Sequence, residues 1–203
     1  GTSCAGNAIG PGVVIDYSRH LNRIIKIDPE NRYAIVEPGV VQAQLQQAAA
    51  PYGLRFGPDP STSSRCTIGG MIGNNACGPH ATAYGRTSDN VLELRLIDGL
   101  GREIIAGQTP KNPPETPQDA PAPDEQIQQI PGLKSLVAAN LATIRREFGR
   151  FGRQVSGYSL EHLLPENGSA LAPFLSGTEG TLGVITQATV RLVPLPKLSL
   201  IHI

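Results

Sequence analysis

The chain has 203 residues, enough for one domain of ordinary size or two small lobes that share a site, and its 39% hydrophobic content is sufficient for a packed core. Its 17 basic and 17 acidic residues cancel, which disfavours binding to nucleic acid or to an anionic membrane surface. No apolar run approaches the roughly 20 residues that span a bilayer, and no signal-peptide pattern opens the chain.

The three cysteines, Cys4, Cys66 and Cys77, form no CxxC pair, and their odd number argues against a disulfide framework. We therefore expect reduced thiols and a cytoplasmic location, and peripheral contact with the inner face of the membrane is left open. Residues 1–3 lie inside a glycine-rich turn with no initiator Met before them, so the chain is expected to come from a longer protein.

The first residues, 1–8, form a turn of small residues whose backbone N–H groups could face an anion. Val13–Asp16, Ile24–Ile27 and Tyr33–Glu37 have the composition of strands, which predicts a small three-stranded lobe. The apolar spacing of Val40–Ala50 then predicts a helix with its glutamines facing solvent.

The segment Cys66–Gly78 has four glycines interleaved with the apolar Ile68, Met71 and Ile72. Since glycine has no Cβ, this composition predicts a sharply turning backbone against a large ligand, as in the wall of a cofactor site. The preceding residues 56–65 contain two prolines and a run of hydroxyls, which indicates either a polar loop or a rigid segment that contacts the same cofactor.

In the second half, residues 91–98 and 102–106 predict an antiparallel hairpin. Residues 108–131 are rich in Pro, Gln, Asp and Glu and predict an exposed, mobile insertion. Leu133–Phe148 then predicts one amphipathic helix, and residues 186–195 alternate as a strand.

Gly177, Gly180 and Gly183 recur every three residues just before that last strand. This spacing favours close approach of the backbone to a flat ligand, with a simple tight turn as the alternative. Of the histidines, His162 lies among leucines and is interpreted as structural, and His80 is the best available candidate for a general base.

Several well-known site patterns are absent from the sequence. It has no GxGxxG between a strand and a helix, no GxxxxGK[ST] phosphate loop, no HExxH and no nucleophile elbow GxSxG. It has no CxxC pair for zinc or an iron-sulfur cluster, and no metal ligands are assigned. The separated Gly, Asn and Ser segments therefore suit a large cofactor bound between parts of the chain.

The order of these segments resembles one family, the flavoproteins related to vanillyl-alcohol oxidase and p-cresol methylhydroxylase (PCMH), in the branch of glycolate oxidase and D-lactate dehydrogenase. The resemblance is carried by the following segments in order: 1–7, 37–39, 57–60, 69–78, 84–90 and 177–183. Residues 155–158 and 163–168 look most like long members that carry an iron-sulfur module after the flavin part. The resemblance implies a two-lobed α+β PCMH-type FAD-binding domain, with a first lobe at 1–57 that lacks its N-terminal part, a second lobe at 58–203, and no substrate domain.

The resemblance also implies which residues contact FAD, whose pyrophosphate would be held by neutral backbone donors and hydroxyls. The implied contacts are Thr2, Ser3, Gly6, Asn7, Pro58, Asp59, Gly69, Gly70, Asn74, Asn75, Gly78, Gly85, Ser88, Glu179, Gly180, Gly183, Val184 and Ile185. No covalent link between a histidine and the flavin is indicated, and the catalytic residues are not assigned.

The activity implied is oxidation of a D-2-hydroxy acid of the lactate or glycolate type by hydride transfer to FAD, with an iron-sulfur module or a quinone as electron acceptor. Because family members bind this substrate in a following domain, we expect the 203-residue chain alone to be inactive. Two alternatives remain open: a non-catalytic subunit or electron-transfer scaffold that keeps the fold, and a reductase of an enolpyruvyl sugar nucleotide.

Overall fold

The computed structural model describes residues 2–3, 6–107, 123–152, 154 and 157–196. Its strands are β1 (Ile24–Asp28), β2 (Tyr33–Val36), β3 (Leu54–Phe56), β4 (Val91–Ile97), β5 (Glu103–Gly107) and β6 (Val184–Pro194). Its α-helices are α1 (Gln42–Ala49), α2 (Ile68–Asn74), α3 (Ala81–Tyr84), α4 (Pro123–Gln128), α5 (Leu133–Ala139), α6 (Leu141–Glu147) and α7 (Leu171–Leu175). Short 3-10 turns are η1 (Ala50–Tyr52), η2 (Ser88–Asn90), η3 (Leu160–Leu163) and η4 (Pro165–Asn167).

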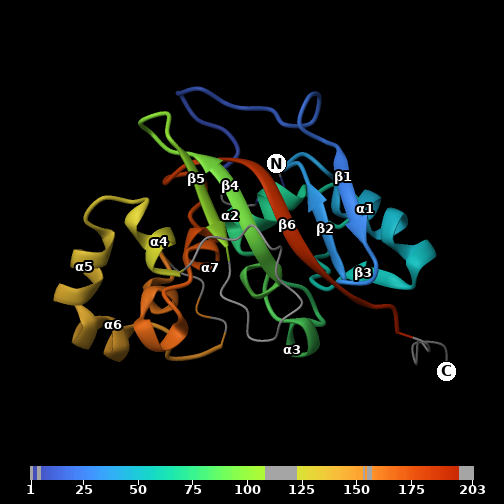
Figure 1. Ribbon diagram of the computed structural model, residues 1–203. Coiled ribbons are helices and arrows are strands. Elements are labelled where there is room, and N and C mark those ends of the chain that lie inside the picture. The colour runs from blue at the N-terminus through green and yellow to red at the C-terminus, as the bar shows by residue number, and fades with distance from the viewer. Residues whose placement is uncertain (1, 4–5, 108–122, 153, 155–156, 197–203) are drawn as a thin grey trace.

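The sheet is organised around β6, the long strand that crosses the centre of Figure 1. The strand order is β1-β2-β6-β4-β5, each neighbouring pair is antiparallel, and β3 pairs with the C-terminal part of β6. Strand β6 therefore joins β2 from the first half of the chain to β4 from the middle. The division into lobes at residue 57 stays a prediction, and the sheet continues across it.

One face of this sheet forms the hydrophobic core together with the helices. The strand residues that are fully or almost fully buried include Ala34, Val36, Leu94, Leu96, Ile104, Ala106, Ala188, Val190 and Leu192. Helix α7 packs against β4 and β5, and α2 adds Ile68, Met71 and Ile72 to the same core. The alternation expected for a half-buried strand holds for β2 and β3, whereas β4 is buried on both faces from Val91 to Leu94.

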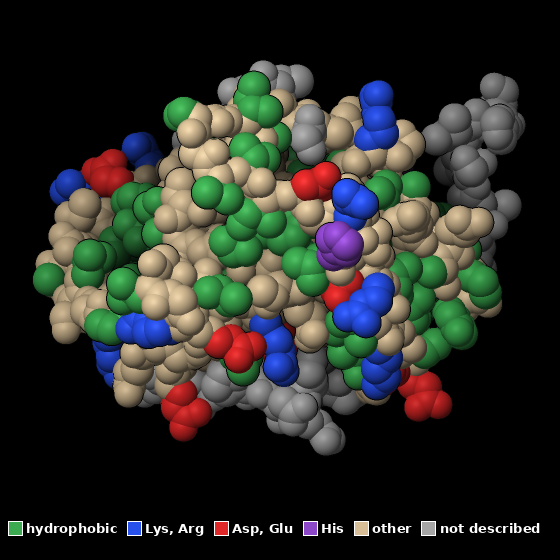
Figure 2. Space-filling model, turned by 90° about the horizontal axis from the view of Figure 1, so that it is seen from above, with side chains coloured by type: hydrophobic (Ala, Val, Ile, Leu, Met, Phe, Trp, Pro, Cys, Tyr) green, Lys and Arg blue, Asp and Glu red, His purple; other side chains and the backbone are tan. Residues whose placement is uncertain are grey.

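The strand predicted at Val13–Asp16 does not form, and the prediction of a three-stranded first lobe was wrong. Val13, Val14 and Ile15 are 92%, 59% and 50% exposed and pair with no described strand. The edge strands of the sheet are β1 and β5, and neither pairs with this run, so apolar composition alone was not sufficient to add it to the sheet. Figure 2, seen from above, shows apolar side chains gathered on the face over which Figure 1 draws this N-terminal segment.

Helix α1 forms as predicted, but Gln42 and Gln46 do not face solvent. Gln42 is buried and its Nε2 donates to the carbonyl of Pro58 at 3.1 Å. Gln46 pairs with both backbone groups of Phe56, accepting from its N–H at 2.8 Å and donating to its carbonyl at 2.9 Å. The glutamine amides thus act as hydrogen-bond partners for the edge of β3.

The single helix predicted over residues 133–148 is two helices, α5 and α6. The break is at Asn140, whose backbone is not helical (φ −120°, ψ 14°) and whose side-chain Nδ2 donates to the Leu136 carbonyl at 2.8 Å. Asparagine competes in this way with the regular backbone hydrogen bonds of a helix.

The predicted insertion at 108–131 is only partly described, because residues 108–122 lie outside the described residues. For residues 123–130 the prediction of an exposed, mobile segment was wrong, since they include helix α4 and bury Ile127. Gln129 exchanges two hydrogen bonds with the backbone of Ile105, and Gln126 accepts from the N–H of Gly107. Side-chain amides therefore attach this polar segment to the edge strand β5, which composition alone cannot reveal.

The glycine-rich segment is the short helix α2 followed by a turn, and not an open loop. Thr67 caps the helix by accepting from the N–H of Gly70 at 3.2 Å, and the helix ends at Asn75 in the left-handed region (φ 50°). Glycine is required at position 69 by packing, because a Cβ there would lie 2.5 Å from the Cβ of Pro38. At Gly73 an added Cβ would make only an ordinary contact of 3.9 Å with Glu179.

We predict that Gly69→Ala destabilises the chain and that Gly73→Ala, in the same helix, does not. Overpacking against the Pro38 backbone costs about 1–3 kcal/mol, whereas alanine in the open position gains up to about 1 kcal/mol of helix propensity. Urea unfolding midpoints of the two variants measure the difference. Equal midpoints would show that α2 can move away from Pro38 freely.

An ion pair between the buried carboxylate of Glu37 and the exposed side chain of Arg23 fixes the connection that leads into β1. Glu37 is 3% exposed, and its carboxylate accepts from the Arg23 guanidinium at 2.7 and 3.0 Å and from the Arg23 backbone N–H at 2.8 Å. The hydrogen bonds from Arg23 hold the pKa of Glu37 below its ordinary value of 4.5. A lowered pKa means that this carboxylate stabilises the fold above pH 4.5 and loses that contribution as the pH falls below it.

Replacement of Glu37 by Gln should therefore lower the free energy of unfolding at neutral pH and make it depend less on pH in the acid range. The wild-type chain should lose more of its unfolding free energy than Glu37→Gln between about pH 5 and the lowered pKa. Denaturant unfolding over that range is the measurement, and other carboxylates such as Asp28, with its pKa at about 2, act equally in both proteins. Parallel pH profiles for the two proteins would contradict the assignment.

Candidate cofactor-binding cavity

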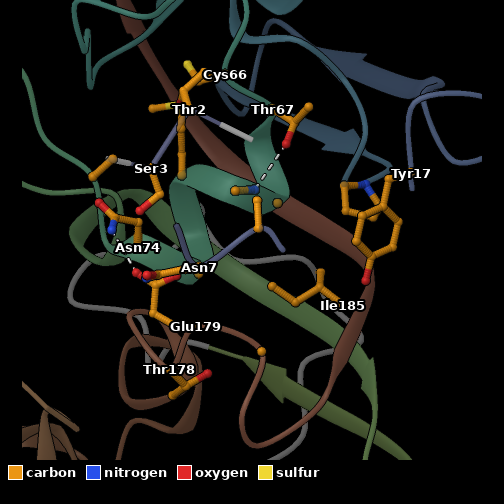
Figure 3. A pocket seen from close by; sticks show the side chains of 18 of the residues that line it. Thr2, Ser3, Asn7, Tyr17, Cys66, Thr67, Asn74, Thr178, Glu179 and Ile185 are labelled. Carbon is orange, nitrogen blue, oxygen red and sulfur yellow. Dashed lines mark hydrogen bonds between the residues drawn. The ribbon is translucent and has the colours of Figure 1, made fainter. Parts of the chain in front are cut away.

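A cavity of about 860 Å³ opens where three separate parts of the chain meet. Its walls come from residues between 2 and 17, between 60 and 77, and between 175 and 185, together with Pro38 and Leu96. The volume is at the upper end of the roughly 300–1000 Å³ found for small-molecule and cofactor sites. Helix α2 passes through the middle of the site in Figure 3.

The lining is almost entirely neutral. Glu179 is the only charged residue among the described residues that line the cavity, and no Lys or Arg is among them. Hydroxyls and carboxamides supply the polar groups, from Thr2, Ser3, Asn7, Ser61, Thr62, Thr67, Asn74, Asn75 and Thr178. Such a set can hold an anionic group through neutral donors without burying a lysine.

Helix α2 is attached to the segment before α1. The N–H of Gly69 donates to the Pro38 carbonyl and the N–H of Ile68 to the Val40 carbonyl, both at 2.8 Å. The N–H of Gly70 is taken by the Thr67 hydroxyl. These N–H groups already have partners, so Gly69 and Gly70 contribute to the cavity mainly by having no side chain.

The other end of α2 is attached to the residues before β6. The N–H of Gly177 donates to the Ile72 carbonyl at 2.8 Å, and the N–H of Glu179 donates to the Gly73 carbonyl at 3.0 Å. The Asn74 amide also donates to the Glu179 carboxylate at 2.7 Å, the bond drawn across the cavity in Figure 3. Residues about 105 positions apart thus meet side by side.

Asn75, one of the lining residues, has an unused side-chain donor. It is 3% exposed, and its Oδ1 accepts from the backbone N–H of Ser88 at 2.9 Å. Its Nδ2 is buried and has no hydrogen-bond partner among the described residues. A buried amide donor without a partner is unfavourable by about 1–3 kcal/mol, so this group indicates a missing acceptor.

Most of the residues predicted from the resemblance lie around this cavity. Those that line it are Thr2, Ser3, Asn7, Gly69, Gly70, Asn74, Asn75, Glu179, Gly180, Gly183, Val184 and Ile185. Those that do not line it are Gly6, Pro58, Asp59, Gly78, Gly85 and Ser88.

Several members of the second group instead support the site from behind. A Cβ on Gly78 would lie 2.2 Å from Oδ1 of Asp59, and a Cβ on Gly85 (φ 73°) would lie 2.6 Å from Oδ2 of Asp89. Ser88 holds Asn75 through its backbone, as described above. These residues shape the turns behind the lining. A sequence motif alone cannot distinguish this role from direct contact with the ligand.

His80, the candidate base, does not line the cavity. Its ring Nδ1 contacts the Asp59 carboxylate, and Arg55 lies 3.7 Å from the same carboxylate. This side chain therefore belongs to a surface ion-pair cluster. In the described part of the chain no group of three or more His, Cys, Asp or Glu residues could hold a metal.

Many lining residues were not among the predicted contacts, and Tyr17 and Cys66 are two of them. Tyr17 lies beside Ile185 in Figure 3, and burial raises the pKa of its phenol. Burial likewise raises the pKa of the Cys66 thiol, so this residue lines the cavity as a neutral group. The only signal for Tyr17 was an aromatic residue directly after the predicted strand Val13–Asp16.

Comparison with known proteins gives the family. A family model described as an FAD binding domain matches residues 1–107, and the chain belongs to this family. It therefore is an FAD-binding domain of the vanillyl-alcohol oxidase and PCMH type, with the mixed α+β fold that was predicted.

Among similar proteins is a D-2-hydroxyglutarate dehydrogenase from Pantoea ananatis, 37% identical over 97% of this chain and 19% of that protein. A D-lactate dehydrogenase from Archaeoglobus fulgidus is 33% identical over 96% of this chain and 32% of its own length. A glycolate oxidase subunit from Bacillus subtilis is 29% identical over 96% of this chain and 30% of its own length. The chain thus spans about a fifth to a third of these relatives.

Among solved structures, an alkyldihydroxyacetonephosphate synthase matches with a TM-score of 0.51 and 17% identity, over 89% of this chain and 23% of that one. This likeness concerns the fold alone. Within the described residues, no helix is long and apolar enough to cross a membrane.

The cavity fits FAD on three observations of its own. It is large, its polar groups apart from Glu179 are neutral hydroxyls and amides, and the lining residue Asn75 has a buried donor without a partner among the described residues. The backbone is also open at Gly180, where an added Cβ would meet no atom within 4 Å. Together these features suit a long ligand that carries a pyrophosphate and flat rings.

Replacing Asn75 by Asp should weaken FAD binding and leave the turn behind it intact. Aspartate keeps the acceptor for the Ser88 N–H and tolerates the left-handed backbone, but it replaces the free donor with an anionic oxygen. We expect FAD to bind about 10- to 100-fold more weakly, the equivalent of about 1.5–3 kcal/mol. Titration of the apoprotein followed by flavin fluorescence measures this, and unchanged affinity would show that Asn75 does not contact the cofactor.

Proposed function

We propose that this chain is the FAD-binding part of a dehydrogenase or oxidase that oxidises a D-2-hydroxy acid by hydride transfer to FAD. The observation that supports the proposal most is the convergence of residues 2–17, 60–77 and 175–185 on one neutral cavity. The relatives support it by their names, which refer to D-2-hydroxyglutarate, D-lactate and glycolate.

The bound cofactor would supply the redox chemistry, and the residues of this chain would bind and orient it. Hydroxyls and amides such as Ser3, Asn7 and Asn75 would hold the anionic part. The apolar Met71, Val184 and Ile185 would exclude water from the rings. We propose the eighteen predicted contacts as the binding set, with Gly6, Pro58, Asp59, Gly78, Gly85 and Ser88 acting by shaping the turns behind the lining.

The remaining parts of the reaction belong to the longer protein from which we propose this chain derives. Its substrate would bind in a following domain, and electrons would leave to an iron-sulfur module or a quinone. We propose a cytoplasmic location, with contact to the inner face of the membrane as the alternative.

Of the other functions considered, the non-catalytic scaffold is disfavoured by the cavity. A scaffold has no use for a buried, unpaired donor at Asn75 or for the open backbone at Gly180. No specific observation favours the enolpyruvyl reductase.

Anaerobic reduction of the flavin is the decisive test. In the full-length protein the flavin absorbance should bleach on addition of D-2-hydroxyglutarate, D-lactate or glycolate, and the L-enantiomers of the first two serve as controls. The 203-residue chain alone should show no turnover with any of them.

Other outcomes would assign the protein differently. Bleaching by NADPH but by none of the hydroxy acids would favour the reductase. A colourless protein that takes up no added FAD would favour the scaffold. Turnover by the 203-residue chain alone would contradict the need for a following domain.

A further inference from the structure

The loop of residues 177–181 forms one wall of the cavity, and its backbone has an energetically unfavourable conformation. It contributes Thr178, Glu179 and Gly180 to the lining. Three of its residues have positive φ: Gly177 at 89°, Glu179 at 52° and Gly180 at 75°. A non-glycine residue such as Glu179 in the left-handed region is disfavoured by roughly 1–2 kcal/mol. The surroundings must therefore hold the loop in this conformation.

From the cavity side, α2 holds this loop. The contacts are the two backbone hydrogen bonds to Ile72 and Gly73 and the bond between Asn74 and Glu179. All three act on residues 177 and 179, and none acts on the last residues of the loop. The end of the loop that leads into β6 needs a different constraint.

From the opposite side, a chain of hydroxyl groups holds that end. The Thr181 hydroxyl donates to the Thr178 carbonyl at 2.5 Å, and the Thr181 N–H donates to the same carbonyl at 3.0 Å. The Tyr158 hydroxyl lies 2.8 Å from the Thr181 hydroxyl. Because the Thr181 proton is used by Thr178, Tyr158 is the donor to Thr181.

The Tyr158 ring is itself fixed. It makes an edge contact with Phe174 at a centroid distance of 6.3 Å, and Phe174 is a buried residue of α7. Tyr158 thus connects the core helix α7 to the far end of the cavity loop, although it does not line the cavity.

We propose that Tyr158 is a positioning residue for the cofactor: through Thr181 and Thr178 it holds loop 177–181 in the conformation that retains FAD. The inference rests on the proposed function, since it concerns the same cavity. The inference nevertheless makes a claim that the proposed function does not, namely that a hydroxyl group outside the cavity controls the rate of FAD release. Loss of this hydrogen bond would free the end of the loop that α2 does not hold.

The test uses hydroxyl deletions at both ends of the bond in the full-length protein. Tyr158→Phe should release FAD about 2- to 10-fold faster than the wild type, the range expected from one neutral hydrogen bond. Thr181→Val should release it at least as fast, since it removes this bond and the hydroxyl's bond to the Thr178 carbonyl. Thr181→Ser keeps the hydroxyl and should restore the wild-type rate. Tyr52→Phe is the matched control, because Tyr52 is also an exposed tyrosine and lies away from the cavity.

Two further measurements separate positioning from general stability. The double variant Tyr158→Phe/Thr181→Val should release FAD no faster than Thr181→Val alone, since Thr181→Val already removes the bond that Tyr158→Phe removes. The melting temperature of the FAD-free protein should not change in Tyr158→Phe, because the bond lies at the surface.

Three results would overturn the inference: a wild-type release rate in Tyr158→Phe, additive rates in the double variant, or an increase that Thr181→Ser does not reverse. Failure of the proposed function itself looks different. In that case the wild-type protein takes up no FAD, and no release rate exists to compare.

Discussion

The structure depends on helix α2 being held at both ends by backbone hydrogen bonds to distant parts of the chain. At its start, Ile68 and Gly69 donate to the carbonyls of Val40 and Pro38. At its end, the carbonyls of Ile72 and Gly73 accept from Gly177 and Glu179. Because glycine at position 69 lets the helix lie directly on Pro38, the cavity walls meet at a distance that a side chain would prevent.

At the edges of the sheet, too, backbone groups form hydrogen bonds with partners outside the regular secondary structure. Gln46 takes the place of a neighbouring strand for Phe56 in β3, and Gln129 does so for Ile105 in β5. A strand edge that lacks a strand partner must find other partners where it is covered. Glutamine provides a donor and an acceptor on one side chain, which suits this role.

The neutrality of the cavity has a direct consequence for how an anionic cofactor is held. With Glu179 as the only charge in the described lining, and with that charge engaged by Asn74, attraction to a pyrophosphate must come from dipoles. Dipolar donors act only at short range and in the correct orientation. Binding therefore depends on positioning, which makes the loop at 177–181 and the turn at Asn75 as important as the groups that touch the ligand.

By itself the sequence determined the elements with strong periodicity and the identity of the cofactor family. Strands β4 to β6 and helix α1 follow from alternation and helical spacing, and the order of the glycine segments indicated FAD before any contact was known. The sequence pattern is enough to predict these elements because the intrinsic propensity of their residues and the spacing of their apolar residues favour the same secondary structure.

Other features were decided only by the tertiary structure, because there the local sequence pattern suggests one structure and the neighbouring parts of the chain impose another. Val13–Asp16 has the composition of a strand but pairs with neither edge strand of the sheet, and Leu133–Phe148 has helical spacing but breaks at Asn140. Residues 123–130 look like a polar insertion, yet two glutamines attach them to β5. For the site, sequence could not separate Asn75, which lines the cavity and has an unpaired donor among the described residues, from Gly78, which packs on Asp59 and does not line it. The physical reason is that a glycine or asparagine in a motif serves either a ligand or a turn, and the choice depends on which distant backbone lies against it.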